Sequence, residues 1–125
     1  MSTLKLGTIA TQDGTESTEV TNVVNGSAKA WVNFNGQGTV AIRKSFNISS
    51  ITDVGTGQYR ANFETAMPDS NYVIVSISAD ISVAGIGSIG IVSGTGFTTT
   101  TAALGTVNSG GSFYDQSNCM YTFFG

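Results

Sequence analysis

The sequence contains no histidine, one cysteine and one proline among its 125 residues. Without histidine, the Ser-His-Asp and Cys-His arrangements of nucleophilic catalysis and the common zinc sites are excluded. The lone Cys119 cannot form a disulfide within the chain, and we expect it to be an ordinary core residue. No EF-hand spacing occurs either. We therefore expect no metal site and no cofactor, and stability that comes from packing or from association with other chains.

Charged residues are also scarce, at 10% of the chain against about 25% in a typical globular domain. Much of the surface must therefore consist of Ser, Thr, Asn and Gly. The formal net charge is −3, and the basic residues do not cluster apart from Arg43 and Lys44. Because nucleic-acid binding needs clustered cations that neutralise phosphates, we expect no nucleic-acid partner.

Long apolar runs are missing as well. None approaches the ~18 residues of a membrane span, so we expect no membrane insertion. The opening MSTLKLGTIATQD has no continuous apolar region of the kind that signal peptides contain. We therefore expect a protein that folds in a reducing cytoplasm.

The sequence does contain repeated alternation of apolar and polar residues, which is typical of strands with one buried face. The 16 glycines indicate many tight turns, and we predict turns at 35–38, 53–57 and 67–70. Arg43 and Ser45 are expected on the face opposite the apolar one. The residues predicted to form apolar faces between positions 28 and 63 are Ala28, Ala30, Val32, Phe34, Val40, Ile42, Phe46, Tyr59, Ala61 and Phe63.

Two later segments also read as strands. From position 73 the apolar residues Val73, Val75, Ile77, Ala79, Ile81 and Val83 alternate with Ser76, Ser78, Asp80 and Ser82. The segment 119–124 is apolar except for Thr122, which fits a central strand buried on both faces, or one with a face against a partner subunit. Because no βαβ pattern occurs, we predict an all-β fold, a compact antiparallel β-sandwich of the jelly-roll kind.

Several segments carry a resemblance to a known family: AKAWVNFNG, TVAIR, the SxxSITDxGTGxY hairpin, AMPDSNY and the C-terminal CMYTFFG. Together with the opening STLKLGTIATQDGTESTEVTNVVNGS, they make the chain similar to a small β-domain of tailed bacteriophages, including phages of cyanobacteria. In those phages the domain recurs in tail fibres and other virion appendages. The family has no shared active site.

The resemblance implies a non-enzymatic virion protein, assembled in the bacterial host cytoplasm as a homotrimer that binds other virion proteins. We expect a tail-fibre or appendage component that contacts the host surface, with a surface glycan as a candidate partner. The alternative is a trimeric capsid decoration protein, which the lack of a heptad or collagen-like rod favours. Residues 1–25 are expected to form an N-terminal attachment arm, and residues 26–125 the β-sandwich domain.

Motifs for enzymatic chemistry are weak. GIGSIG (Gly85, Gly87 and Gly90) matches GxGxxG, but the IVSGTGFTTTT that follows does not read as the helix that a dinucleotide site needs. A polysaccharide-cleaving protein needs two facing carboxylates. The pairs available are Glu64 with Asp69 and Asp80 with Asp115, yet Glu64 is expected on a solvated face and Asp69 in a turn.

Aromatic residues offer the better candidate ligand-binding sites. Trp31 lies on the polar face of its predicted strand and could stack on a sugar ring, although packing or a subunit interface is the favoured interpretation. Phe113 and Tyr114 stand beside Asp115 and Gln116, after two glycines. This combination of stacking and hydrogen-bonding groups is typical of sugar sites, and the alternative is an ordinary loop that leads into the last strand.

Overall fold

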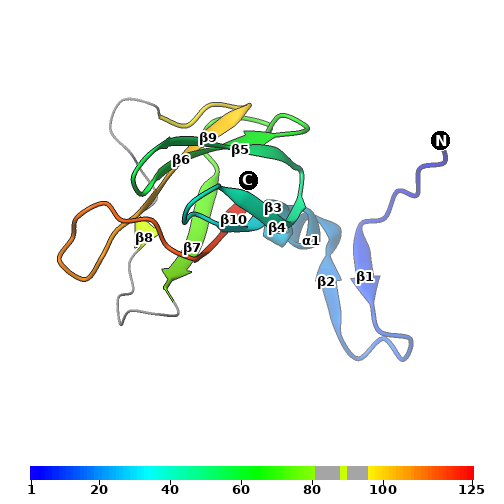
Figure 1. Ribbon diagram of the computed structural model, residues 1–125. Coiled ribbons are helices and arrows are strands. Elements are labelled where there is room, and N and C mark those ends of the chain that lie inside the picture. Colours follow the sequence, from blue (N-terminus) through cyan, green and yellow to red (C-terminus); the bar gives the residue numbers. More distant parts are fainter. Residues whose placement is uncertain (81–87, 90–95) are drawn as a thin grey trace.

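The computed structural model covers residues 1–125 and describes all of them except 81–87 and 90–95 (Figure 1). The described strands form antiparallel sheets, and α1 is short, so the prediction of an all-β fold is confirmed. The elements in chain order are β1 (Thr8–Ala10), β2 (Ser17–Glu19), α1 (Val20–Gly26), β3 (Ala28–Asn35), β4 (Ala41–Phe46), β5 (Ile48–Gly55), β6 (Gln58–Phe63), β7 (Val73–Ala79), β8 (Ser88–Ile89), β9 (Thr101–Thr106) and β10 (Asn118–Phe124).

Two four-stranded sheets make up the body of the protein. One has the strand order β4-β3-β10-β7 and the other β5-β6-β9-β8, while β1 and β2 form a separate hairpin. The two larger sheets lie one above the other, and the hairpin projects to one side (Figure 1). Each of the two sheets therefore has an inner face toward the other and an outer face that points away.

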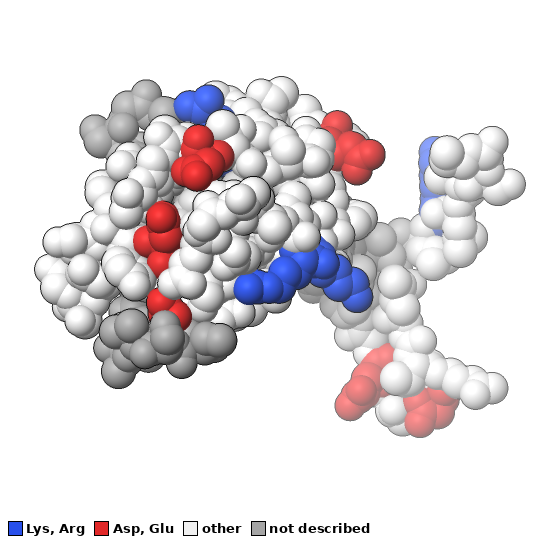
Figure 2. Space-filling view, in the orientation of Figure 1, with Lys and Arg blue, Asp and Glu red and all other residues white. Residues whose placement is uncertain are grey.

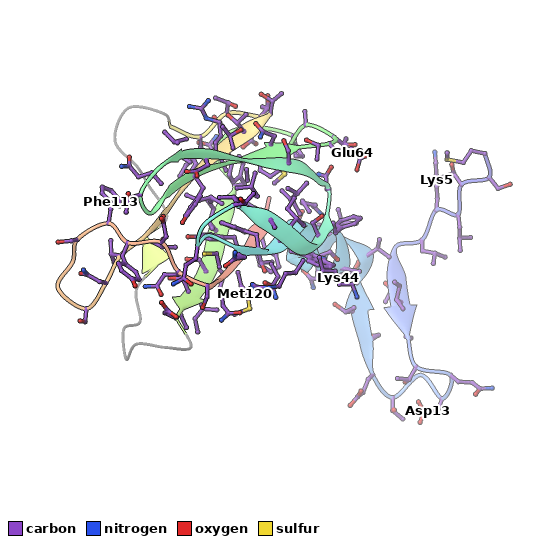
Figure 3. The ribbon with its side chains drawn as sticks, viewed as in Figure 1. Lys5, Asp13, Lys44, Glu64, Phe113 and Met120 are labelled. Carbon is purple, nitrogen blue, oxygen red and sulfur yellow. The ribbon has the colours of Figure 1, made fainter. Side chains whose placement is uncertain are left out.

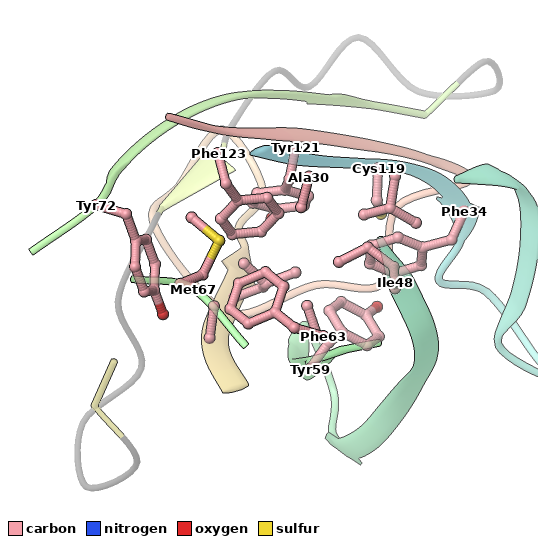
Figure 4. Packing of buried hydrophobic residues seen from close by; sticks show 14 residues of the cluster. Ala30, Phe34, Ile48, Tyr59, Phe63, Met67, Tyr72, Cys119, Tyr121 and Phe123 are labelled. Carbon is pink, nitrogen blue, oxygen red and sulfur yellow. The ribbon is translucent and has the colours of Figure 1, made fainter. Parts of the chain in front are cut away.

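The core lies between the two inner faces and is rich in aromatic rings (Figure 4). The Phe34 ring packs edge-on against Tyr59 with the centroids 5.1 Å apart, and the Phe63 ring packs in the same way on Phe123 at 5.2 Å. Each pair joins one sheet to the other, and edge-to-face contacts add to the energy of burial. The core thus fixes how the sheets are stacked.

The buried tyrosine hydroxyls all donate to protein oxygens, as burial requires. Tyr121 Oη donates to the Gly105 carbonyl at 2.7 Å, and Tyr72 Oη donates to the Thr101 carbonyl at 3.0 Å. Tyr59 Oη donates to Asp115 Oδ1 at 2.8 Å. Desolvation by burial raises the pKa of Tyr72 to about 12 and raises the pKa values of Tyr59 and Tyr121 as well.

The faces predicted for β3 and β6 are confirmed. Ala30, Val32 and Phe34 of β3 are buried, as are Tyr59, Ala61 and Phe63 of β6. β10 is a central strand between β3 and β7, as predicted. It is buried on one face only: Cys119, Tyr121 and Phe123 point into the core, whereas Met120 on the other face is exposed.

The prediction for β4 is wrong in part. Lys44 pairs with Asn33, but Ile42 pairs with Phe34, so Arg43 is an extra residue in a bulge. One extra residue inverts the alternation on its far side. Phe46 therefore lies on the outer face with Trp31, rather than on the apolar inner face where we expected it, and Ser45 takes the inner position.

β7 has the predicted alternation, but its apolar residues point outward. Val73, Val75 and Ile77 are exposed, while Ser78 and Asp80 on the opposite face are buried. The inner end of this strand therefore carries polar groups, and Ser117 Oγ donates to Asp80 Oδ1 at 3.3 Å. Ile81, Ser82 and Val83, and the glycines of GIGSIG, lie outside the described residues.

The connections follow the turn chemistry of the sequence. Gly57, at the β5–β6 turn, has φ of 63°, and in the 67–70 turn Asp69 Oδ1 accepts from the Asn71 amide at 2.7 Å. β4 passes to β5 in the other sheet through the single residue Asn47, which has φ of 54°. The Asn47 side chain fixes this corner by accepting from the Thr65 amide at 2.7 Å and donating to the Lys29 carbonyl at 3.1 Å.

Candidate functional site

The outer face of the sheet β4-β3-β10-β7 carries an exposed apolar surface. Val73 is 61% exposed, Val75 59%, Ile77 53% and Phe46 54%. Contiguous exposed apolar surface is unusual on a protein that works alone and marks interaction sites. We call this surface the apolar outer face, and its members are Trp31, Phe46, Val73, Val75, Ile77, Met120 and Phe124.

Strand register makes this surface continuous. Trp31 pairs with Phe46 on one side and with Thr122 on the other, and Thr122 pairs in turn with Val75. In the neighbouring row Met120 pairs with Ile77. Side chains directly opposite on paired strands are in contact distance, so the apolar groups form one band across all four strands.

Cations lie at the β4 edge of this band. Lys44 pairs with Asn33 on the outer side of the sheet, and Lys29 precedes Trp31 on β3. Arg43 donates to Asn33 Oδ1 at 3.3 Å and to the Ser117 carbonyl at 2.6 Å. Figure 2 shows a blue cluster where the body meets the hairpin, and Figure 3 places Lys44 there. The apolar outer face is thus positively charged along one side.

The outer face of the other sheet is different. Asn62 Nδ2 donates to Ser50 Oγ and to Thr52 Oγ1, each at 3.0 Å, and Ser49 Oγ donates to the Asn62 carbonyl at 3.0 Å. These polar groups bond to one another and to water, which is typical of a solvated sheet face. The two outer faces therefore have unlike chemistry, and only one is suited to apolar docking.

Trp31 belongs to the apolar outer face. It is half-buried between Phe46 and Thr122, with Lys29 and Asn33 as its neighbours on the same side of β3. An aromatic residue in a wide apolar band fits a protein interface. The same ring also remains accessible for stacking on a sugar.

The second candidate segment, Phe113–Gln116, is built into the body more firmly than the sequence indicates. Asp115 Oδ1 accepts from the Gly57 amide at 2.6 Å and from Tyr59 Oη at 2.8 Å. Gln116 is buried, and its Nε2 donates to the Val107 carbonyl at 3.0 Å, while its Oε1 has no partner among the described residues. These hydrogen bonds of Asp115 and Gln116 hold the loop in place.

Only the aromatic part of this segment faces outward. Phe113 is exposed and Tyr114 is half-buried, with the Tyr114 amide donating to the Thr106 carbonyl at 3.0 Å. Phe113 lies at the opposite end of the body from Lys44 (Figure 3). Trp31 and Phe113 therefore do not belong to one site.

In the candidate carboxylate pairs, Asp80 and Asp115 accept hydrogen bonds from other groups of the protein, whereas Glu64 is exposed. Asp80 Oδ2 accepts from Gln37 Nε2 at 2.6 Å, and Asp115 is bonded as described above. Glu64 is exposed at a shallow hollow that also involves Lys29, Phe46, Asn47 and Thr65. Among the described residues, no group of three or more Cys, Asp or Glu side chains could hold a metal ion.

Cys119 lies in the core, as expected. It is fully buried, and its Sγ donates to the Gln116 carbonyl at 3.3 Å. Desolvation by burial raises its pKa to about 12. The thiol is therefore neutral and unreactive in the folded protein.

The arm predicted for residues 1–25 contains β1, β2 and most of α1, and it extends away from the body (Figure 1). None of the α1 residues is buried. The exposed apolar side chains of the arm are Leu4, Leu6, Ile9, Val23 and Val24. The arm thus presents apolar groups of its own, on the side of the body where the cations lie.

The sequence reasoning missed the extent of the apolar outer face. It identified the apolar character of segment 119–124 and the apolar alternation of β7. The sequence signal that could have revealed the whole surface is that β10 is apolar on both faces. Once β7 lies beside such a strand, its apolar side can face either the core or solvent, and only the pairing decides between them.

No family model, curated protein or solved structure matches this chain. None of the described helices has the length and apolar character that a membrane crossing demands.

Proposed function

We propose that this chain is a non-enzymatic structural protein of a bacteriophage particle, a tail-fibre or appendage component that contacts the host surface. In this proposal the two-sheet body is a jelly-roll-like sandwich, and the protein assembles as a homotrimer bound to other virion proteins. The resemblance to the phage β-domain supplies the virion setting and the trimer.

The observation that carries an assembly role is the apolar outer face. Seven side chains form it, as named above, and the four whose exposure was given are each more than half exposed. A surface of this kind is costly in water and is retained where another protein covers it. The arm adds a second exposed apolar element to the same chain.

The non-enzymatic part of the proposal has separate support. Asp115 accepts from the Gly57 amide and Tyr59 Oη, and Asp80 accepts from Gln37 and Ser117. Carboxylates that satisfy internal donors have little freedom to act as a general acid or base on a bound sugar. A host glycan would therefore be bound rather than cleaved, with Trp31 or Phe113 as the stacking surface.

A capsid decoration protein is the second candidate. The observation that favours it is the combination of a broad apolar sheet face with an arm beside it, which suits attachment across a shell of repeated subunits. In this role the outer face would cover the capsid or a sister subunit, and the polar face of the other sheet would face solvent.

The proposal can be tested on phage particles produced by the bacterium in which this gene is expressed. Mass spectrometry of gradient-purified particles should detect the chain at a fixed ratio to the major capsid protein. Gold-labelled antibody should then mark the tail if the chain is an appendage component, and the head if it is a decoration protein. Absence of the chain from purified, infectious particles would refute both candidates.

A further inference from the structure

The N-terminal arm has structure but lacks a core. Among the described strands, β1 and β2 pair only with each other, and every residue of α1 is exposed or half-buried. A two-stranded hairpin is marginally stable by itself in water, and so is an isolated helix shorter than about 12 residues. These elements therefore need a surface on which to pack.

The two-sheet body of the same chain does not supply that surface. Val23 and Val24 in α1 and Ile9 in β1 remain exposed, and the arm points away from the sheets (Figure 1). Its attachment to the body is local, through hydrogen bonds from Ser27 Oγ to the Val23 carbonyl and from Lys29 Nζ to the Val24 carbonyl. The packing partner must therefore come from another molecule.

The apolar outer face has the matching chemistry. Both surfaces are exposed and apolar, with aliphatic side chains on the arm and a mixture of aliphatic and aromatic side chains on the outer face. Cations border it at Lys29, Arg43 and Lys44, and none of the three makes an ion pair with a described residue. An anionic, aliphatic segment is the complement of such a surface.

The arm is that kind of segment. It carries three carboxylates, Asp13, Glu16 and Glu19, against the single cation Lys5. Hydrogen bonds from Thr11 and Thr15 lower the pKa of Asp13 to about 2. The carboxylate is anionic at neutral pH with or without this shift, because its ordinary pKa is 3.8. Figure 2 shows the red tip of the arm and the blue edge of the body as separate regions of one chain.

We propose that the apolar outer face binds the N-terminal arm of a second copy of this chain. Each copy has one arm and one face, so the contact is heterologous and closes into a ring when the rotation between copies permits it. The inference deepens the proposed function, because it names the partner of the outer face, but it can be tested without a virus particle.

The first test compares two exposed valines on strands of different sheets. Val75 of β7 is 59% exposed on the apolar outer face, and Val54 of β5 is 48% exposed in the other sheet. Val75→Asp should weaken self-association at least about thirty-fold, the effect of losing one interface hot spot. Val54→Asp should change it by less than about three-fold. Val24→Asp on the arm should act as Val75→Asp does.

The measurement is light scattering and sedimentation velocity of the purified full chain at about 1–100 µM, with circular dichroism to verify that each variant is folded. A wild-type chain that is monomeric at the highest concentration overturns the inference. So does a Val75→Asp variant that is folded and associates as the wild type does, since the interface would then lie elsewhere.

Cross-linking tests the pairing itself. A photoreactive benzoylphenylalanine at position 24, in a mixture of ¹⁴N- and ¹⁵N-labelled chains, should give mixed-isotope links to peptides that contain Phe46 or Val75. Links within single-isotope chains only, or to the β5–β6 sheet, overturn the inference. Particles that contain the chain, together with a monomeric purified chain, would leave the virion role standing, while they would remove the arm–face contact and count against the homotrimer.

Discussion

Gly57 is the position where one added methyl group should be most damaging. Its φ is 63°, and a Cβ there would lie 2.5 Å from the Tyr114 amide nitrogen and closer still to the Thr106 carbonyl oxygen. Both obstacles are backbone atoms, which cannot rotate away. Gly57→Ala therefore forces the β5–β6 turn apart from the strand β9 and from the loop that leads to β10.

Gly38 provides the matched control. Its φ is 62°, yet a Cβ there would meet nothing within 4 Å. Gly38→Ala therefore has only the conformational cost of the left-handed region, about 1 kcal/mol, part of which is offset because alanine also stiffens the unfolded chain. The difference between the two variants isolates the steric effect.

The magnitude follows from the hydrogen bonds that the shift would break. Gly57 donates to Asp115 Oδ1 at 2.6 Å, and its carbonyl accepts from the Thr106 amide at 2.8 Å. A bond to a charged group contributes about 1.5–3 kcal/mol and a neutral one about 0.5–1.5 kcal/mol. We expect Gly57→Ala to lower the free energy of unfolding by about 2–4 kcal/mol more than Gly38→Ala.

Urea unfolding followed by the fluorescence of Trp31, the one tryptophan, measures this difference. For a slope of about 2 kcal/mol per molar urea, the midpoint of Gly57→Ala should fall roughly 1–2 M below that of Gly38→Ala. If the two variants agree within about 0.5 kcal/mol, the crowding of Gly57 against Tyr114 and Thr106 has been misjudged.

Three further predictions follow from the same contacts. Asp115→Ala should destabilise the protein by about 2–4 kcal/mol, because the Gly57 amide loses its acceptor, whereas Asp115→Asn should cost less; a mild effect on urea unfolding together with lost glycan binding would make Asp115 a ligand residue instead. Deleting Met1–Asn25 should leave the sheets folded, as near-identical thermal unfolding would show, but abolish incorporation into particles; incorporation at normal copy number would move the attachment site into the sandwich. The folded pKa of Cys119, about 12 against 9.0, means that its contribution to stability is complete below pH 9 and is lost as the pH rises toward 12. Thermal unfolding should therefore show a decline above pH 9 that starts later, near the tyrosine pKa of 10.0, in Cys119→Ala.

The elements that could be predicted from the sequence are those in which one local rule decides the outcome. Strict alternation in β3 and β6 assigns Phe34 and Tyr59 to the core, and a glycine with free φ assigns the turn at Gly57. In β4 the bulge at Arg43 depends on the neighbouring strand, and no feature of AIRKSF reveals it. The outward side of Phe46 was therefore predicted wrongly.

For the candidate site, the sequence predicted which kinds of residue take part but not which residues surround them. Trp31 was identified because an aromatic ring interrupts a polar face, and the structure adds the neighbours that turn it into part of a band. Asp115 and Gln116 look like ligand groups in a list of residues. Their role in the loop depends on contacts with Gly57, which is distant in sequence, and with the Val107 carbonyl. Residue propensity and motif spacing carry no information about such contacts.

The position of β10 has a consequence for how the protein folds during its synthesis. This strand is the last described one, yet it lies between β3 and β7 and pairs with both. The sheet cannot close until residues 118–124 have left the ribosome, so β3 and β7 wait with unpaired edges during synthesis. Pairing between such distant segments is slow. Newly made chains therefore pass through a stage with open strand edges, and the chaperones of the cell that makes them affect the yield of folded protein.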